Sequence, residues 1–253
     1  MRNTLNKNPE ERLIFALDMG NRIDEAMSWV DRLKEHVGLF KIGKESFAYH
    51  GPEIVQKIKA KGCQVFLDLK FHDIPNTVAA AAVAAVKLGV VMFNVHALGG
   101  KNMMEHAVTA TSRAAQQADM PVPLVLAVTV LTSLNDGDLK EMGFRRSASE
   151  LALDLARIAQ DAGISGVVAS PHDVEGIRIA CGWDFVIVCP GIRGKEMADD
   201  DQKRTWTSKD AIAKGADYIV VGRPIRKADD PVHEADMMIH DIAEGLAIRE
   251  KVV

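Results

Sequence analysis

The chain lacks the features that mark several specialised classes of protein. It has three cysteines in 253 residues, Cys63, Cys181 and Cys189, and no CxxC pair, which is typical of reduced thiols in a reducing compartment. No apolar run approaches the roughly 18 residues of a membrane span. Residues 1–12 are polar and have no apolar core, so they do not resemble a signal peptide. These absences together predict a cytoplasmic protein.

An excess of basic residues is also absent. The formal net charge is −4 and the pI is about 6.1, so neither nucleic acid nor an anionic membrane is an expected partner. Any anionic ligand must therefore be held by a local group of positive side chains. The composition itself is ordinary for a soluble globular protein, with 47% hydrophobic and 26% charged residues.

Short apolar runs recur along the chain and alternate with segments of helical periodicity. Eight runs predict strands that are buried on both faces: Leu13–Leu17, Leu39–Ile42, Gln64–Leu69, Val90–Val95, Leu124–Val130, Gly166–Ala169, Phe185–Cys189 and Tyr218–Val221. Helices are predicted at Ile54–Ala60, Ser149–Gln160 and Ala211–Lys214, each followed closely by a glycine. The polar segment between Leu131 and Ser149 is expected to hold an inserted loop or a short helix, and Gly191–Thr207 a mobile loop.

Two α/β architectures fit this alternation, a closed barrel and a doubly wound open sheet. The barrel is favoured because the runs number eight, the length is close to the ~250 residues of a typical barrel, and no GxGxxG follows the first run. No composition break divides the chain. We therefore expect one (β/α)₈ TIM-barrel domain over residues 1–253, with a flexible N-terminal tail at residues 1–11.

Charged and polar residues cluster where the predicted strands end, which is the face that carries active sites in such barrels. The third strand has the sharpest pattern, with Asp68 and Lys70 at its end and Asp73 just beyond it. Side chains two apart on a strand share a face, so Asp68 and Lys70 are expected to point the same way. A salt bridge that only plugs the barrel would explain this pair alone. Asp18 and Lys41, at other strand ends, weaken that explanation because several buried charges are costly unless paired or used.

The segment Asp-x-Lys-x-x-Asp-Ile-Pro-x-Thr, residues 68–77, resembles the active-site signature of orotidine 5′-monophosphate decarboxylases. Further matches follow in family order and span residues 13–226: Phe15-Ala16-Leu17-Asp18, Phe40-Lys41-Ile42-Gly43, Val128-Thr129-Val130-Leu131-Thr132-Ser133, Pro190-Gly191-Ile192-Arg193, Asp201-Gln202-Lys203-Arg204 and Val221-Gly222-Arg223-Pro224-Ile225. The resemblance implies a cofactor-free carboxy-lyase that converts orotidine 5′-monophosphate to UMP and CO₂, the last step of de novo pyrimidine nucleotide synthesis.

The resemblance also implies a role for each matching residue. Lys70 would protonate C6 of the pyrimidine within an alternating network of Lys41, Asp68, Lys70 and Asp73, and Asp68 would lie beside the substrate carboxylate. Asp18 and Lys41 would contact the ribose hydroxyls, and Thr132 the pyrimidine amide edge. The phosphate would be bound by Gly222, Arg223, Arg193 and Gln202. Asp73 and Thr77 would enter the neighbouring subunit's site, which predicts a homodimer.

Two other functions remain open on the sequence alone. Metal-dependent sugar-phosphate decarboxylases and hexulose-phosphate synthases use a similar DxKxxD, but Lys41 places a cation where their acidic metal ligand is expected. No His or Cys pattern has metal-ligand spacing either, so no metal is predicted. The other alternative is a nucleotide-binding barrel that does not catalyse, because a fold alone does not prove a function.

Some polar residues near these motifs are interpreted more simply. Lys44 and Arg226 are expected to be solvated surface charges, and His72 to have a packing or loop role. His96 follows the fourth strand and is a weaker candidate for a contact in the site.

Overall fold

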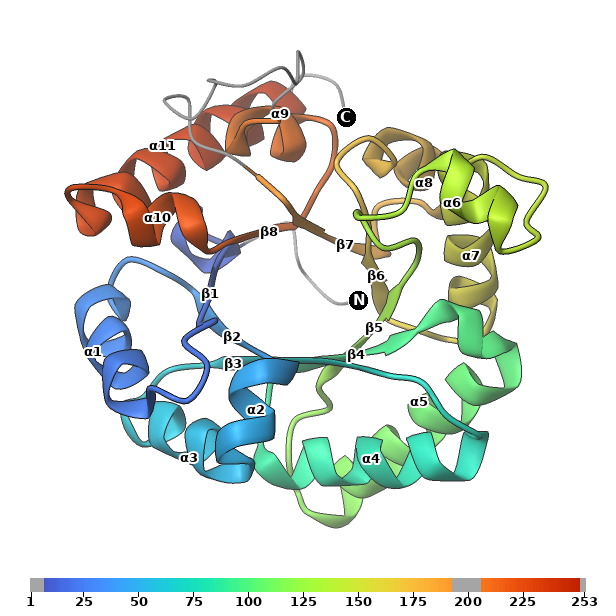
Figure 1. Cartoon of the computed structure of the whole chain (residues 1–253), viewed down its shortest axis with the longest axis horizontal. Helices are drawn as coiled ribbons and strands as arrows, with labels where there is room; N and C mark the ends of the chain where they lie inside the picture. Colours follow the sequence, from blue (N-terminus) through green and yellow to red (C-terminus); the bar gives the residue numbers. More distant parts are fainter. Residues whose placement is uncertain (1–6, 193–205, 251–253) are drawn as a thin grey trace. The chain divides into compact units, whose positions relative to one another are not determined.

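The computed structural model describes residues 7–192 and 206–250 (Figure 1). Its strands are all parallel in the pairs described, and their order is β1-β2-β3-β4-β5-β6-β7-β8, closed as a barrel. The strands are β1 (Leu13–Ala16), β2 (Leu39–Gly43), β3 (Val65–Phe71), β4 (Met92–His96), β5 (Leu124–Val128), β6 (Gly166–Val168), β7 (Val186–Pro190) and β8 (Tyr218–Val221). This is the predicted (β/α)₈ TIM-barrel fold, and each predicted run contains or overlaps one strand.

Helices connect the successive strands. They are α1 (Ile23–Leu33), α2 (Lys44–His50), α3 (Pro52–Ala60), α4 (Pro75–Leu88), α5 (Gly100–Gln117), α6 (Asp136–Glu141), α7 (Ala148–Asp161), α8 (Val174–Cys181), α9 (Ser208–Ala213), α10 (Arg223–Lys227) and α11 (Pro231–Arg249), with short 3₁₀ helices η2 (Glu10–Arg12) and η3 (Ala97–Gly99). Helix α6 is the short helix allowed for between Leu131 and Ser149. In the part of the chain described, no helix combines the length and apolarity needed to cross a membrane.

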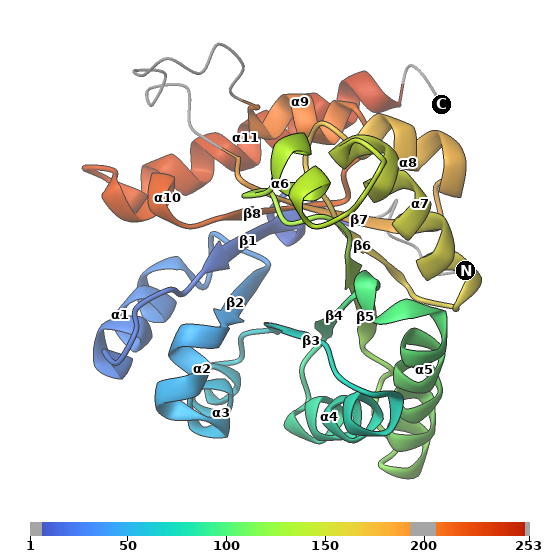
Figure 2. The same cartoon turned by 45° about the vertical axis from the view of Figure 1, so that its right-hand side comes forward.

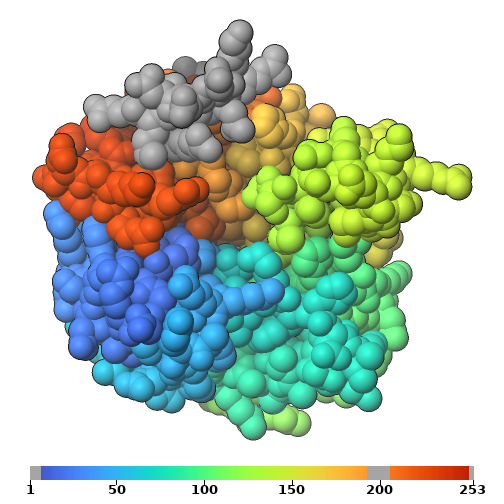
Figure 3. Space-filling model, viewed as in Figure 1, coloured from blue at the N-terminus to red at the C-terminus, as the bar shows by residue number. Residues whose placement is uncertain are grey.

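Two compact units make up the chain, the first formed by Met1–Asp68 with Cys189–Val253. In this unit β1 pairs with β2 on one side and with β8 on the other, so that Phe15 is level with both Phe40 and Val221. Every residue of β1, β2 and β8 is buried, which the continuous apolar sequences of β1 and β8 predict. Figure 3 shows the N-terminal segment in blue against the C-terminal helices in red. The two ends of the sequence thus build this unit together.

The second unit is Leu69–Val188, in which β4, β5, β6 and β7 pair in sequence. Helices α4 and α5 lie side by side along it (Figure 2). Helix α7 begins at Ala148 because Ser147 and Glu150 form a capping box, in which each side chain accepts from the other residue's backbone N–H. This local signal places the helix start slightly before the predicted Ser149.

The predicted N-terminal tail lies partly outside the described residues, which begin at Lys7. Within the described part, Glu11 accepts a hydrogen bond from the backbone N–H of Asn8 at 2.8 Å, and this bond lowers the pKa of the Glu11 carboxyl. The loop predicted at Gly191–Thr207 lies outside the described residues except for its ends, residues 191–192 and 206–207.

Candidate active site

A buried lysine with two carboxylate neighbours lies in strand β2 of the first unit. The Nζ of Lys41 lies 3.1 Å from Oδ1 of Asp18 and 3.5 Å from Oδ2 of Asp68. The side chains of Lys41 and Asp68 are 10% and 13% exposed, whereas that of Asp18 is 50% exposed. Burial makes a lone charge costly, and the two carboxylates compensate for the cation here. Three residues predicted from separate strand ends are thus brought together at hydrogen-bond or ion-pair distance.

Two glycines leave the space that this cluster occupies. A Cβ on Gly43 would lie 3.1 Å from Nζ of Lys41 and 3.2 Å from Oδ1 of Asp18. A Cβ on Gly222 would lie 3.2 Å from the Cβ of Ala16 and 4.0 Å from Oδ2 of Asp18. Gly222 therefore lies against the end of β1, next to Asp18, and Arg223 follows it as an exposed side chain at the start of α10. Gly43 matched the family pattern, but the sequence did not indicate its role as a spacer.

Arg226 holds the main chain at Asp18, which corrects the expectation that it is a solvated surface charge. Its Nη1 donates a hydrogen bond to the backbone oxygen of Asp18 at 2.7 Å, and the residue is half-buried. On the other side of the turn, the buried hydroxyl of Ser46 donates to the backbone oxygen of Leu17 at 3.0 Å. These two contacts fix the segment from which the Asp18 carboxylate extends. Lys44, by contrast, is exposed as predicted.

The second unit carries the remaining described residues of the predicted site. Lys70 is partly buried near the end of β3, and its φ is 50°, so regular strand alternation does not by itself fix the direction of its side chain. Its backbone N–H donates to Oδ1 of Asn94 at 2.7 Å. Asn94 was not identified from the sequence, where it is one polar residue in an apolar run. No motif indicated it.

Asp73, Thr77 and Thr132 are all exposed in this unit. Asp73 Oδ1 accepts a hydrogen bond from the backbone N–H of Ile74 at 2.6 Å, just before α4 begins at Pro75. Thr77 lies in the first turn of α4, and Thr132 lies in the turn that follows β5. All three side chains are therefore accessible to a ligand or to another chain.

Two histidines pack together beside this segment. The rings of His72 and His96 are stacked with centroids 5.5 Å apart and planes at 26°. Nδ1 of His96 also accepts from the backbone N–H of Leu98 at 3.4 Å. This geometry agrees with the packing or loop role expected of His72, and it gives His96 a structural partner.

Two predicted phosphate contacts, Arg193 and Gln202, lie outside the described residues. Within the described residues, no three His, Cys, Asp or Glu side chains gather closely enough to hold a metal ion.

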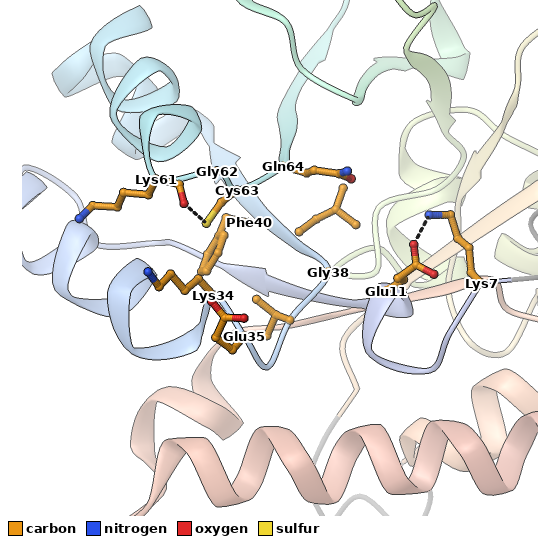
Figure 4. A pocket seen from close by; sticks show the side chains of 12 residues that line it. Lys7, Glu11, Lys34, Glu35, Gly38, Phe40, Lys61, Gly62, Cys63 and Gln64 are labelled. Atoms are coloured by element: carbon orange, nitrogen blue, oxygen red, sulfur yellow. Dashed lines mark hydrogen bonds and ion pairs between the residues drawn. The ribbon is translucent and has the colours of Figure 1, made fainter.

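A separate cavity of about 290 Å³ opens at the other end of β2 (Figure 4). Gly38, Leu39 and Phe40 line it, whereas Gly43 lies at the opposite end of the same strand and Lys41 is not among the lining residues. Some of its charged side chains are paired within the first unit: Lys7 pairs with Glu11 at 3.4 Å, and Lys61 pairs with Asp31 at 2.7 Å. The predicted catalytic residues take no part in it.

Comparison with known proteins identifies the family of the chain. The model of the family described as "Orotidine 5'-phosphate decarboxylase / HUMPS family" matches residues 11–238. The orotidine 5'-phosphate decarboxylase of Syntrophus aciditrophicus is 60% identical over 245 residues, which cover 96% of this chain and 98% of that protein. That of Pelobacter propionicus is 49% identical over 235 residues, covering 93% and 96%.

A solved structure is similar over nearly the whole chain as well. The crystal structure of orotidine 5'-phosphate decarboxylase from Lactobacillus acidophilus has a TM-score of 0.80 and 38% sequence identity, and the match covers 91% of this chain and 98% of that one. With the barrel topology and the family match, this likeness leads to one conclusion. The chain belongs to the orotidine 5'-phosphate decarboxylase / HUMPS family.

Proposed function

We propose that this protein converts orotidine 5′-monophosphate to UMP and CO₂ without a cofactor, with Lys70 as the proton donor. The chain is a carboxy-lyase, since its relatives are decarboxylases at up to 60% identity over nearly its full length. The observation that carries the finer proposal is the buried Lys41, held between Asp18 and Asp68 at 3.1 and 3.5 Å. Such a preorganised set of charges is what a decarboxylation with no covalent electron sink requires.

The chemistry follows from the fate of one electron pair. When the bond between C6 and the carboxylate breaks, CO₂ leaves and the pair stays on C6. The ammonium of Lys70 stabilises this developing carbanion and transfers a proton to it, which gives UMP; solvent then returns the proton to the amine. Asp73 completes the alternating charge network with Lys41, Asp68 and Lys70.

Asp68 has a second role in the proposal, because it lies beside the departing carboxylate. Two like charges about 4 Å apart repel by roughly 4 kcal/mol at an effective dielectric constant near 20. Departure of CO₂ relieves this repulsion. It supplies only part of the barrier reduction, since enzymes reach about 23 kcal/mol, and preorganised charge supplies much of the rest.

The remaining residues bind the substrate. Asp18 and Lys41 contact the ribose hydroxyls, and the half-exposed carboxylate of Asp18 supports this role. Thr132 hydrogen-bonds the pyrimidine amide edge. The phosphate is bound by the backbone N–H of Gly222 and by Arg223, Arg193 and Gln202, in the loops after strands seven and eight where barrels often hold phosphate. A planar guanidinium fits phosphate geometry, which supports Arg223 in particular.

The functional form is a homodimer in which Asp73 and Thr77 enter the neighbouring subunit's site. Both residues are exposed, and Ile74 between them is 67% exposed, so polar and apolar groups are available there for contact with a second subunit. We further propose that the chain acts as one domain in the cytoplasm, at the last step of de novo pyrimidine nucleotide synthesis.

One assay tests the reaction and its independence of metal. Purified protein is mixed with orotidine 5′-monophosphate and EDTA, and the ultraviolet absorbance change is followed. We expect rapid conversion. Lys70→Ala should fold and bind nucleotide but lose nearly all turnover, whereas Lys44→Ala, which changes an exposed lysine, should keep it. Near-normal turnover by Lys70→Ala would contradict its role, and activity that requires Mg²⁺ would favour the metal-dependent relatives of this barrel.

A mixing experiment tests the shared site. Asp73→Asn and Lys70→Ala are each expected to be nearly inactive alone. If the sites are shared, hybrid dimers contain one site with both native residues, and mixing restores part of the activity. Absence of recovery, with subunit exchange demonstrated by labelled chains, would argue against a site formed by two subunits.

A further inference from the structure

The main chain of Lys70 has a conformation that side-chain-bearing residues rarely adopt. Its φ of 50° is in the left-handed region, although the residue belongs to the seven-residue strand β3. Among the described residues, the other non-glycine residue with positive φ is Asp119, which lies in the turn after α5. A conformation of this kind persists only where the surroundings hold it, and such residues concentrate at functional sites.

The side chain of Asn94 supplies one such restraint. Asn94 lies in β4 and has no exposed surface, and its Oδ1 accepts the backbone N–H of Lys70 at 2.7 Å. A buried amide is costly unless its polar atoms are used, so an asparagine among Phe93, Val95 and the other apolar residues of this strand requires a specific partner. The peptide group that leads into Lys70 is one such partner.

This hydrogen bond controls the direction in which the lysine side chain leaves the backbone. The peptide plane before Lys70 and the φ of Lys70 together set the Cα–Cβ direction. A residue that relaxed from left-handed to extended φ would turn its Cβ away and displace an ammonium at the end of four methylene groups. Displacements of about 1 Å at a reacting group can lower a rate about 100-fold.

We infer that Asn94 is a positioning residue for Lys70: it holds the main chain of the proton donor in the left-handed conformation from which the ammonium reaches C6. The inference rests on the proposed role of Lys70. It concerns the chemical step rather than the affinity for nucleotide, because Asn94 contacts the main chain of the lysine and the contacts proposed for the nucleotide come from other residues.

The test compares variants that keep or remove the acceptor oxygen. Asn94→Leu has a similar shape without the oxygen, and Asn94→Asp keeps an oxygen at the same position. We expect Asn94→Leu to lower kcat about 100-fold with KM and the Kd for UMP within threefold of the parent. Asn94→Asp should bring kcat back to within tenfold of the parent. Asn94→Ser, a smaller polar residue, is the second variant if the leucine does not fold, and it should lose at least tenfold in kcat.

Thr111→Val is the matched control for general loss of stability. Thr111 is also fully buried in this unit, and its hydroxyl donates to the backbone oxygen of Ala107 at 2.7 Å, but it lies on α5 away from β3. The control should lower Tm as the Asn94 variants do and leave kcat unchanged below Tm. If a folded Asn94→Leu or Asn94→Ser keeps kcat within threefold of the parent, the positioning role is wrong.

Failure of this inference is distinguishable from failure of the proposed function. If Lys70→Ala retains turnover, Lys70 is not the proton donor, and the inference about Asn94 fails as well. Loss of turnover in Lys70→Ala, together with an active Asn94→Leu, would leave the decarboxylase intact and reject only the role of Asn94. A crystal structure of Asn94→Leu gives the direct readout, because φ of residue 70 should leave the left-handed region.

Discussion

The ammonium of Lys41 lies 3.1 Å from the carboxylate of Asp18, and the two groups differ fivefold in exposure, 10% for the lysine side chain against 50% for the aspartate. The cation is therefore held inside the first unit by a carboxylate that still faces solvent. A carboxylate oxygen can accept more than one hydrogen bond, so Asp18 can bind Lys41 and a substrate hydroxyl at once. This pairing links the buried charge cluster to the surface at which we propose that the nucleotide binds.

Replacing Asp18 should weaken substrate binding more than it slows chemistry. Asp18→Ala removes a charged hydrogen bond of about 1.5–3 kcal/mol, which corresponds to a loss of roughly 10- to 150-fold in kcat/KM. Most of the loss should appear as an increase in KM, measured by steady-state kinetics. Asp24→Ala, at an exposed position on α1, is the control and should change neither constant. A loss confined to kcat would mean that Asp18 acts on the chemical step instead.

A methyl group at residue 43 should disturb the same pair by steric contact alone. Gly43 has φ −88° and ψ 176°, which any residue adopts, but its Cβ would lie 3.1 Å from Nζ of Lys41. Gly43→Ala should therefore lower kcat/KM about tenfold or more, a loss of about 1.4 kcal/mol, with little change in Tm. Gly176→Ala is the control, because nothing lies within 4 Å of its Cβ in helix α8, and it should be slightly more stable and fully active.

The sequence predicted the strands well for a physical reason. Each strand of a parallel barrel is buried on both faces, so runs such as Leu13–Leu17 and Tyr218–Val221 are apolar throughout and end at turn residues. The motif residues Asp18, Lys41 and Asp68 were predicted because charged side chains at the ends of buried strands are conspicuous. Their assembly into one cluster follows from parallel pairing, which aligns the carboxyl ends of β1, β2 and β3.

Features that depend on tertiary contacts could not be predicted. The left-handed φ of Lys70 has no signal in the sequence, because lysine has no preference for it, and it is accompanied by a hydrogen bond to Asn94 from another strand. The role of Arg226 also has no signal in the sequence. Its Nη1 donates a hydrogen bond to the backbone oxygen of Asp18, which lies 208 positions away in the chain.

A buried ion pair near the end of the chain should matter for stability rather than for catalysis. Nη2 of Arg249 lies 3.5 Å from Oδ1 of Asp217, with side chains 4% and 0% exposed. Arg12 is buried beside them, and its Nη1 donates to the backbone oxygen of Asp217 at 3.2 Å. Burial lowers the pKa of Arg12, and the charge of Asp217 opposes that shift. The Asp217 carboxylate thus contributes to compensating two buried guanidinium groups.

Asp217→Asn should consequently destabilise the fold by about 3–5 kcal/mol, since removing one partner leaves buried charge uncompensated. At roughly 2–4 °C per kcal/mol for a chain of this size, Tm should fall by about 6–20 °C. Thermal unfolding followed by circular dichroism measures the shift, and kcat at 25 °C should be unchanged. The double variant Asp217→Asn/Arg249→Met should recover part of the loss. A shift of Tm below 2 °C would show that the pair is dispensable.

The carboxyl of Asp173, just before helix α8, should make stability depend on pH in the direction opposite to that of most carboxylates. Burial raises its pKa above the ordinary 3.8, and the hydrogen bond from Ser149 Oγ at 2.6 Å only partly opposes this. The folded protein therefore binds this proton more tightly than the unfolded chain. Between pH 3.8 and the raised pKa, the free energy of unfolding falls as pH rises, and the cost of the buried charge remains in full above that range.

Asp173→Asn keeps the acceptor for Ser149 without the charge, so its advantage over the parent in urea unfolding should be largest at pH 7 and shrink towards pH 4. Asp184→Asn, at an exposed position, is the control and should show no such trend. An advantage equal at both pH values would mean that the amide stabilises by packing and that the buried charge is not the cause.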